Sequence, residues 1–173
     1  MDARTRGKCD LRQWLSKHLP TESLLPTSWR SQPGSFVALM SIYESNYRRL
    51  GQLVGELHSL DGLHRSSVQG DVELELTVIE RSPYTTMLQL TYLFGEGAAI
   101  PTAPDMEVRI YHDAQLAEAY SWANRHAHPL LRSWRHHAGL DLDQRWTRNI
   151  VLNKWLEYCL ERGHGFTQLH AAP

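Results

Sequence analysis

The sequence has little cysteine and no long hydrophobic run. Its 173 residues contain two cysteines, Cys9 and Cys159, which are too few for a disulfide framework. Residues 9–19, after a basic N-terminus, alternate Leu and Trp with Arg, Gln, Lys and His, which is not the pattern of a signal peptide. The uncharged apolar stretches are shorter than the roughly 18–20 residues that span a bilayer. We therefore expect a soluble, cytoplasmic protein without a membrane partner.

Several signatures of nucleotide and hydrolase sites are also absent. The chain has no Gly-x-x-x-x-Gly-Lys-Ser/Thr phosphate loop, no Gly-x-Gly-x-x-Gly after a strand, no Gly-x-Ser-x-Gly and no His-Glu-x-x-His. No cofactor is predicted, and any chemistry must come from side chains that folding brings together.

The net charge of −1 hides a strong polarity along the chain. Residues 71–118 contain two bases and nine acids, whereas residues 1–35 contain six bases and three acids and residues 119–140 three bases and no acid. The near-neutral total argues against a generally basic nucleic-acid binder. Instead, a partner would contact a protein with an acidic middle segment and basic flanking segments.

The length and the proline distribution predict one domain with a leader, since domains most often have about 100–150 residues. Residues 1–34 contain three prolines and are interpreted as a leader or linker with one short amphipathic helix at 11–19. That helix either docks on its own domain or binds a partner. Residues 35–165 form the predicted single domain, and residues 166–173 form a tail.

Two helices are predicted from apolar residues at helical spacing. The first follows Ser35, a candidate N-cap, and its pattern reaches Leu57, although two glycines weaken its second half so that it could end near residue 50. The second starts at Asp141 or Asp143 and ends at Gly163, a candidate residue for the C-terminal cap.

Between the helices the apolar period changes to two. This alternation predicts half-buried antiparallel strands over 72–78, 88–94, 106–112 and 115–122. The expected fold is α+β in two layers: an N-terminal helix, a four-stranded antiparallel meander and a C-terminal helix on one face of the sheet. Asn149 lies in the apolar stripe of the second helix and must be hydrogen-bonded if it is buried.

Four runs of the sequence resemble a known family. They are residues 39–50, 78–86, Met106-Glu-Val-Arg-Ile-Tyr-His-Asp113, and Asn149-x-x-Leu-x-x-Trp155-Leu-x-Tyr-Cys-Leu160. These runs are similar to the YqiB-like proteobacterial family of unknown function, and the similarity covers residues 36–165. The resemblance implies no activity, cofactor or catalytic residue, because none is assigned to that family. The leader and the His-rich segment 124–137 depart from the family pattern.

A first cluster of chemically active residues is expected where two strands end at the same edge of the sheet. It contains Arg109, Tyr111, His112 and Asp113 from one strand end, and Glu80, Arg81 and Tyr84 from the other. His112 could act as a base with Asp113 or Glu80 orienting it, and Arg109 could hold a phosphate or carboxylate.

A structural interpretation of the same cluster competes with the functional one. Arg109 could pair across strands with Glu73, Glu75 or Glu118, which would make it part of a solvated sheet face. His112 would then be an ordinary residue at a strand end. Neighbouring residues of a strand point to opposite faces, which works against direct contact between His112 and Asp113.

The ten histidines raise the question of a metal site. His126, His128, His136 and His137 share one segment, and Cys159 or an acid could complete a tetrahedral site. Three arginines in the same segment oppose a cation, and the spacing fits no common metal motif. No metal is predicted, and the segment is interpreted as a solvated basic loop or hairpin.

Trp122 and Trp134 lie in the basic segment 119–140. Aromatic side chains between bases could stack on a nucleobase or bind its phosphates. Its three arginines are too few for tight binding to duplex DNA, so the expected ligand is a mononucleotide or an acidic protein surface. Alternatively, both tryptophans cap the core.

Two functions follow from these patterns. The preferred one is a non-catalytic binding or accessory protein for a small anionic ligand or a protein partner. The alternative is a small hydrolase or transferase that acts on a phosphorylated or nucleotide substrate. An open edge strand of the sheet could also pair with a second copy and form a homodimer.

Overall fold

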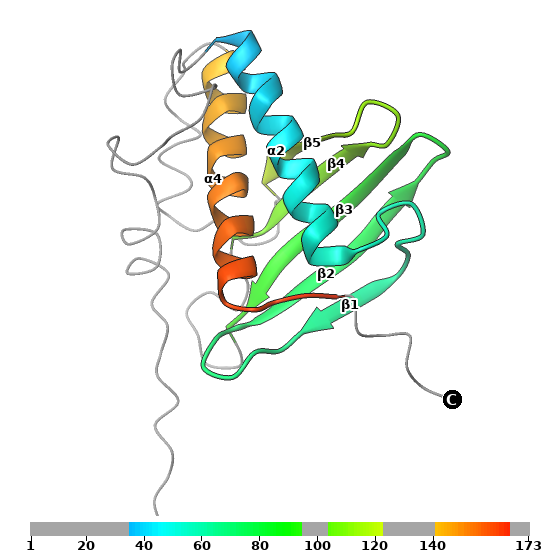
Figure 1. Cartoon of the computed structure of the whole chain (residues 1–173), viewed down its shortest axis with the longest axis vertical. Helices are drawn as coiled ribbons and strands as arrows, with labels where there is room; N and C mark the ends of the chain where they lie inside the picture. The colour runs from blue at the N-terminus through cyan, green and yellow to red at the C-terminus, as the bar shows by residue number, and fades with distance from the viewer. Residues whose placement is uncertain (1–34, 95–103, 123–140, 167–173) are drawn as a thin grey trace, which may run out of the picture.

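Two helices lie side by side across one face of an antiparallel sheet (Figure 1). The computed structural model describes residues 35–94, 104–122 and 141–166. Within them the helices are α2 (Phe36–Val54) and α4 (Asp141–Glu161), one before the strands and one after them. The predicted α+β class and two-layer arrangement are therefore confirmed. We call the face under the helices the inner face and the opposite one the outer face.

The sheet has five strands in the order of the sequence, β1-β2-β3-β4-β5, and each pair of neighbours is antiparallel. The strands are β1 (Leu63–Ser66), β2 (Glu73–Arg81), β3 (Thr85–Leu93), β4 (Met106–Tyr111) and β5 (Leu116–Trp122). The four predicted strands correspond to β2–β5. The prediction missed β1, because its four residues, Leu-His-Arg-Ser, have no alternation of apolar and polar side chains.

Local signals define both ends of α2. The Ser35 hydroxyl accepts a hydrogen bond from the Ala38 backbone N–H at 3.2 Å, which satisfies one of the free donors of the first turn. Gly55 ends the helix with a φ of 83°, a conformation that favours glycine. The N-cap prediction is confirmed, and the helix ends beyond residue 50.

The core lies between the helices and the inner face. Trp155, Leu152 and Leu156 of α4 are fully buried in one cluster with alternate residues of β2, β3 and β4. Gly163 follows α4 with a φ of 86°, as expected for a residue of the C-terminal cap. Beyond it, Phe166 is buried and its N–H donates to the Leu53 carbonyl at 2.8 Å, so the packed region extends to residue 166.

Buried amides join both helices to the last strand of the sheet. Asn149 Oδ1 accepts hydrogen bonds from Asn46 Nδ2 at 3.1 Å and from the Ala119 N–H at 2.8 Å. Asn46 Nδ2 also donates to the Ala117 carbonyl at 3.3 Å, and Arg148 Nε to the Ala119 carbonyl at 3.3 Å. Asn149 is thus hydrogen-bonded, as predicted. A homodimer stays a prediction, and these side chains already occupy backbone groups of β5 that a second copy would need.

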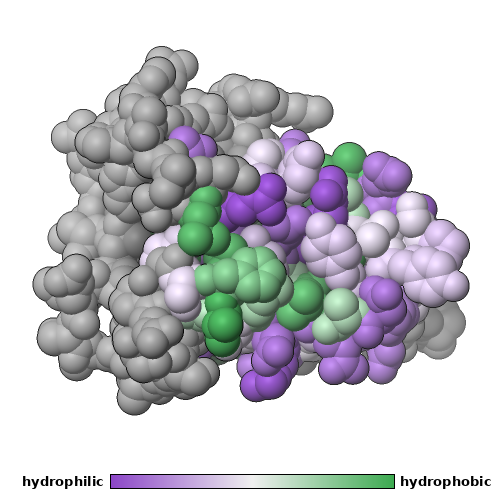
Figure 2. Space-filling view, turned by 90° about the horizontal axis from the view of Figure 1, so that it is seen from above, coloured by the Kyte–Doolittle hydropathy of each residue, from purple (hydrophilic) through white to green (hydrophobic). Residues whose placement is uncertain are grey.

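Figure 2 views the molecule from the end at which α2 begins and shows hydrophobic side chains bordered by hydrophilic ones. Phe36 and Val37, in the first turn of α2, expose 66% and 74% of their surface. Neither described helix is long and apolar enough to cross a membrane.

Candidate functional site

The three connections at one end of the sheet bring the predicted residues together. They are the loop after α2, the β2–β3 turn and the β4–β5 turn, at the right of Figure 1. A β-bulge in β2 decides which side chain reaches which face there. Val78 pairs with Leu88, but Glu80 pairs with Met87, so Ile79 is the extra residue. After a bulge of this kind, side chains that would have pointed to one face of the sheet point to the other.

The reversal places Glu80 on the outer face and Arg81 on the inner face. Glu80 joins the outer face with Met87, whereas Arg81 pairs with Thr86, which is buried on the inner face. The single cluster expected from the sequence is therefore divided between two pockets. We call them the inner pocket and the outer pocket.

The inner pocket has a volume of about 450 Å³ and is lined by His58, Arg81, Ser82, Pro83 and His112. Arg81 Nη2 donates a short hydrogen bond to the His58 carbonyl, which ties the β2–β3 turn to the loop after α2. The imidazoles of His58 and His112 pack with their centroids 4.3 Å apart. One guanidinium and two imidazoles thus line a single cavity.

His112 is the buried member of this pocket. Its Nε2 lies 2.8 Å from the Thr86 hydroxyl, while its buried Nδ1 has no hydrogen-bond partner. Burial lowers the pKa of His112, and the nearby His58 and Arg81 lower it further against the opposing effect of Asp113. The lowered pKa favours the neutral imidazole, although positive charge surrounds it. A bound anion would raise this pKa again.

The outer pocket has a volume of about 250 Å³ and is lined by Glu80, Thr85, Met87, Arg109 and Tyr111. The Arg109 guanidinium lies over the Tyr120 ring, 4.0 Å from its centroid, and Arg109 Nε is 3.2 Å from Met87 Sδ. A planar guanidinium is well suited to such a position on an aromatic face.

The cross-strand ion pair considered for Arg109 is not formed. Glu118 is directly opposite Arg109 in the register, but Glu118 accepts a hydrogen bond from the Tyr111 hydroxyl at 2.7 Å and lies 3.9 Å from Arg145. Glu75 pairs with Arg65 at 2.8 Å. Among the described residues, no carboxylate forms an ion pair with Arg109.

The other predicted residues lie outside the two pockets. Asp113 is exposed in the β4–β5 turn and makes no hydrogen bond with His112. Tyr84 exposes 69% of its surface beside Pro83, and Trp122 ends β5 opposite Met106. Trp134 lies outside the described residues, as do the leader and the four histidines of 126–137.

Sequence reasoning missed five lining residues: His58, Ser82, Pro83, Thr85 and Met87. Ser82 and Pro83 are residue types common in turns, and they carry no chemical signal. His58 belongs to a loop without a periodic pattern, and only the packing of α2 on the sheet brings it to His112.

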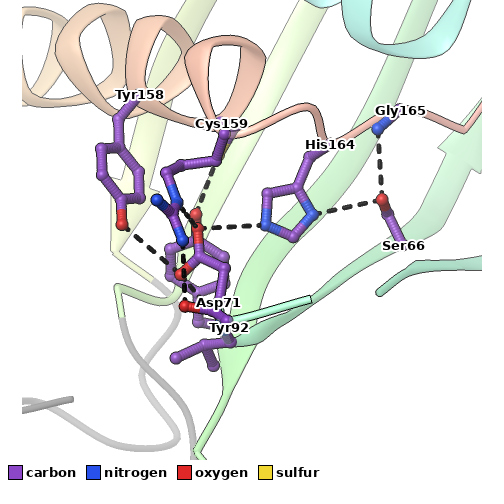
Figure 3. Close-up of polar contacts among 10 residues, drawn as sticks. Ser66, Asp71, Tyr92, Tyr158, Cys159, His164 and Gly165 are labelled. Carbon is purple, nitrogen blue, oxygen red and sulfur yellow. Dashed lines mark hydrogen bonds and ion pairs between the residues drawn. The ribbon is translucent and has the colours of Figure 1, made fainter. Parts of the chain in front are cut away.

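A second polar cluster lies at the opposite end of the sheet, where β1 turns into β2 (Figure 3). Asp71 is its centre: Oδ2 lies 3.0 Å from Arg162 Nε and 3.5 Å from His164 Nε2. Asp71 Oδ1 accepts from the Val72 N–H at 2.8 Å and from the Tyr158 hydroxyl at 3.4 Å. We call this cluster the Asp71 clasp.

Ser66 completes the clasp and gives it the composition of a Ser-His-Asp triad. Ser66 Oγ is 3.2 Å from His164 Nδ1 and accepts a hydrogen bond from the Gly165 N–H at 3.1 Å. Ser66 exposes 7% of its surface, and the side chains of His164 and Asp71 expose 0% and 4%. We interpret the clasp as structural, because these buried groups hold the chain after α4 against β1 and the turn that follows it.

Cys159 lies beside the clasp and is an unreactive cysteine. Its Sγ is 3.3 Å from the Tyr92 hydroxyl, and both side chains are buried. Burial raises the pKa of Cys159 to about 12 and also raises the pKa of Tyr92. Cys159 is therefore a thiol at neutral pH, and thiols are poor nucleophiles and metal ligands. In the described part of the chain, no three His, Cys, Asp or Glu side chains are grouped to hold a metal ion.

The fold and the two pockets define a small α+β protein with a cation-lined cavity at one end of its sheet. Residues 49–165 match the family described as "Protein of unknown function (DUF1249)", and the chain belongs to this family. It is also 27% identical over 140 residues to the uncharacterized protein YqiB of Escherichia coli K12 and to YqiB of E. coli O157:H7. In both comparisons the similarity covers 74% of this chain and 90% of the relative. No solved structure matches the chain. The family predicted from the sequence runs is thus confirmed.

Proposed function

We propose that this protein binds a small anionic ligand, such as a phosphate or carboxylate compound, in the inner pocket. The observation that supports the proposal is the convergence of Arg81, His58 and His112 on one cavity of about 450 Å³. This volume is within the roughly 300–1,000 Å³ of small-molecule sites. A guanidinium can hold an oxyanion through two parallel hydrogen bonds.

The state of His112 supports an anion in particular. Its imidazole is buried and carries a nitrogen without a partner, while His58 and Arg81 place positive charge nearby. An anion beside these groups would raise the pKa of His112 and favour its protonated, donating form. Binding should therefore be tighter at lower pH.

Binding is better supported than hydrolysis. A catalytic histidine commonly depends on a carboxylate that orients it, and here Thr86 is 2.8 Å from His112 Nε2 while Asp113 is exposed. Glu80, the other carboxylate considered for this role, lines the outer pocket. The cytoplasmic location and a protein partner stay predictions.

The test is the melting temperature of the full chain with increasing inorganic phosphate at constant ionic strength. Phosphate at 100 times its dissociation constant should stabilise the wild type by about 2.7 kcal/mol. The variant Arg81→Gln should lose most of this stabilisation. Arg48→Gln is the matched control, since Arg48 is an exposed arginine of α2 that pairs with Glu44 at 3.5 Å.

The outcomes separate binding from catalysis. Equal stabilisation of the wild type and Arg81→Gln, or none of the wild type, would overturn the proposed site. The wild type and His112→Gln are also assayed with p-nitrophenyl phosphate. Turnover that His112→Gln abolishes without a change in folding would favour the hydrolase instead.

A further inference from the structure

The outer pocket places opposite charges on two sides of a flexible apolar side chain. Glu80, Met87 and Arg109 are register partners in one row across β2, β3 and β4. Neighbouring strands are about 4.8 Å apart, so the backbones of Glu80 and Arg109 are separated by about twice that distance. Thr85 and Tyr111 form the next row of the pocket and add two hydroxyl groups.

Two bulges create this arrangement. The Ile79 bulge moves Glu80 to the outer face. A second irregularity, where Val108 pairs with Ala119 and Glu107 with Ser121, leaves Tyr120 as the extra residue of β5. The Tyr120 ring then lies under the Arg109 guanidinium. Bulges often redirect side chains in this way beside functional sites.

Neither charged group has an ionic partner among the described residues. Arg109 is positioned by Tyr111, Tyr120 and Met87, and none of these contacts neutralises its charge. Glu80 is exposed and forms no ion pair within the described residues. Glu80 and Arg109 also form no ion pair with each other, which leaves room for a ligand between them.

We propose that the outer pocket is a second binding site, for a small zwitterion of the α-amino acid type. The carboxylate of the ligand would bind Arg109, its ammonium group would bind Glu80, and an apolar side chain would rest on Met87. The pocket of about 250 Å³ is smaller than most drug-sized sites, in keeping with a ligand of this size. Glu80 would repel a simple anion, which distinguishes this site from the inner pocket.

The test compares three compounds that differ in charge and share the isobutyl group: L-leucine, 4-methylpentanoate without the amino group, and 3-methylbutylamine without the carboxylate. Binding to the full chain is followed by NMR through the methyl group of Met87. The chain has four methionines, and the Met87 signal is assigned by its loss in Met87→Leu. L-Leucine should bind about tenfold more tightly than either analogue, because each analogue leaves one charged group unpaired.

Two variants identify the charge partners. Arg109→Gln should remove the advantage of L-leucine over 3-methylbutylamine, and Glu80→Gln should remove its advantage over 4-methylpentanoate. The matched controls are Arg65→Gln and Glu73→Gln, which change the same charges elsewhere on the sheet. Each variant is first shown to have the wild-type melting temperature within a few degrees.

The results have clear consequences for the proposal. Equal affinity of the wild type for L-leucine and 4-methylpentanoate would overturn the zwitterion site in favour of a simple anion site. Absence of L-leucine binding would overturn it outright. Phosphate stabilisation that is lost in Arg81→Gln but kept in Glu80→Gln would show that the inner pocket stands independently of this result.

Discussion

His112 and His164 are both buried, yet their surroundings differ at the two ends of the sheet. His112 lines a cavity and contacts Thr86 and His58. His164 lies in the Asp71 clasp, between Ser66 and Asp71 and against Tyr92. Burial is the main cause of the lowered pKa of both imidazoles.

The difference shows that a perturbed histidine is not by itself a functional signal. The clasp contains a serine, a histidine and an aspartate in contact, but these side chains are buried and bind one another. The inner pocket contains fewer internal hydrogen bonds and more unneutralised charge. Space beside the histidine and the positive charge of Arg81 are what support a ligand site there. A nitrogen without a hydrogen-bond partner does not distinguish the two, because His164 Nε2 also lacks one and lies 3.5 Å from Asp71.

The largest expected effect is the loss in free energy of unfolding when each of the two histidines is replaced by alanine. His164→Ala leaves a closed cavity and removes the contacts to Ser66 and Asp71, so the free energy of unfolding should fall by about 2–4 kcal/mol. His112→Ala only enlarges an existing pocket and should cost about 1–2 kcal/mol. Urea unfolding followed by tryptophan fluorescence measures both. Equal losses would remove the proposed distinction.

A matched pair of serines gives a smaller effect. Ser66→Ala removes a buried hydroxyl that binds the Gly165 N–H and contacts His164, so it should lower the free energy of unfolding by about 1–2 kcal/mol. The hydroxyl of Ser82, which lines the inner pocket, makes no hydrogen bond within the described residues. Ser82→Ala should change stability by less than about 0.5 kcal/mol. The same urea titration tests the pair, and a larger cost at Ser82 would contradict it.

The smallest effect is the dependence of stability on pH. The folded protein keeps both histidines neutral below the pH at which the unfolded chain protonates them, because their pKa values are lowered from 6.5. The unfolded state then binds more protons, so stability is complete above pH 6.5 and falls as the pH drops through the lowered values. Urea unfolding at pH 7.5 and pH 5.5 should show this loss.

Low millimolar sulfate distinguishes the contributions of the two histidines in the same experiment. Its charge is constant between pH 7.5 and pH 5.5. It should reduce the loss of stability in the wild type and in His164→Ala, but not in His112→Gln. Ionic strength is kept equal, because sulfate also stabilises proteins by exclusion from their surface. The same effect in His112→Gln would show that sulfate acts only in this general way.

Much of the fold could be predicted from local patterns. Helical spacing after Ser35 and the alternation in β2–β5 placed these elements, because one face of each must be buried. The strand β1 was missed, since its position depends on pairing with β2 and its own side chains carry no pattern. The candidate site was predicted in part: Glu80, Arg81, Arg109, Tyr111 and His112 do line pockets.

The sequence by itself determined the class of fold, the helix caps at Ser35 and Gly163, the need for a hydrogen-bonded Asn149 and the end of the sheet at which charged residues gather. All of these follow from local spacing and residue chemistry. Only the tertiary structure decided that Glu80 faces the outer side and Arg81 the inner side, that His58 meets His112, and that Arg109 lies over Tyr120. These facts depend on strand register, on two bulges and on the packing of α2, which arise from contacts between residues distant in the sequence.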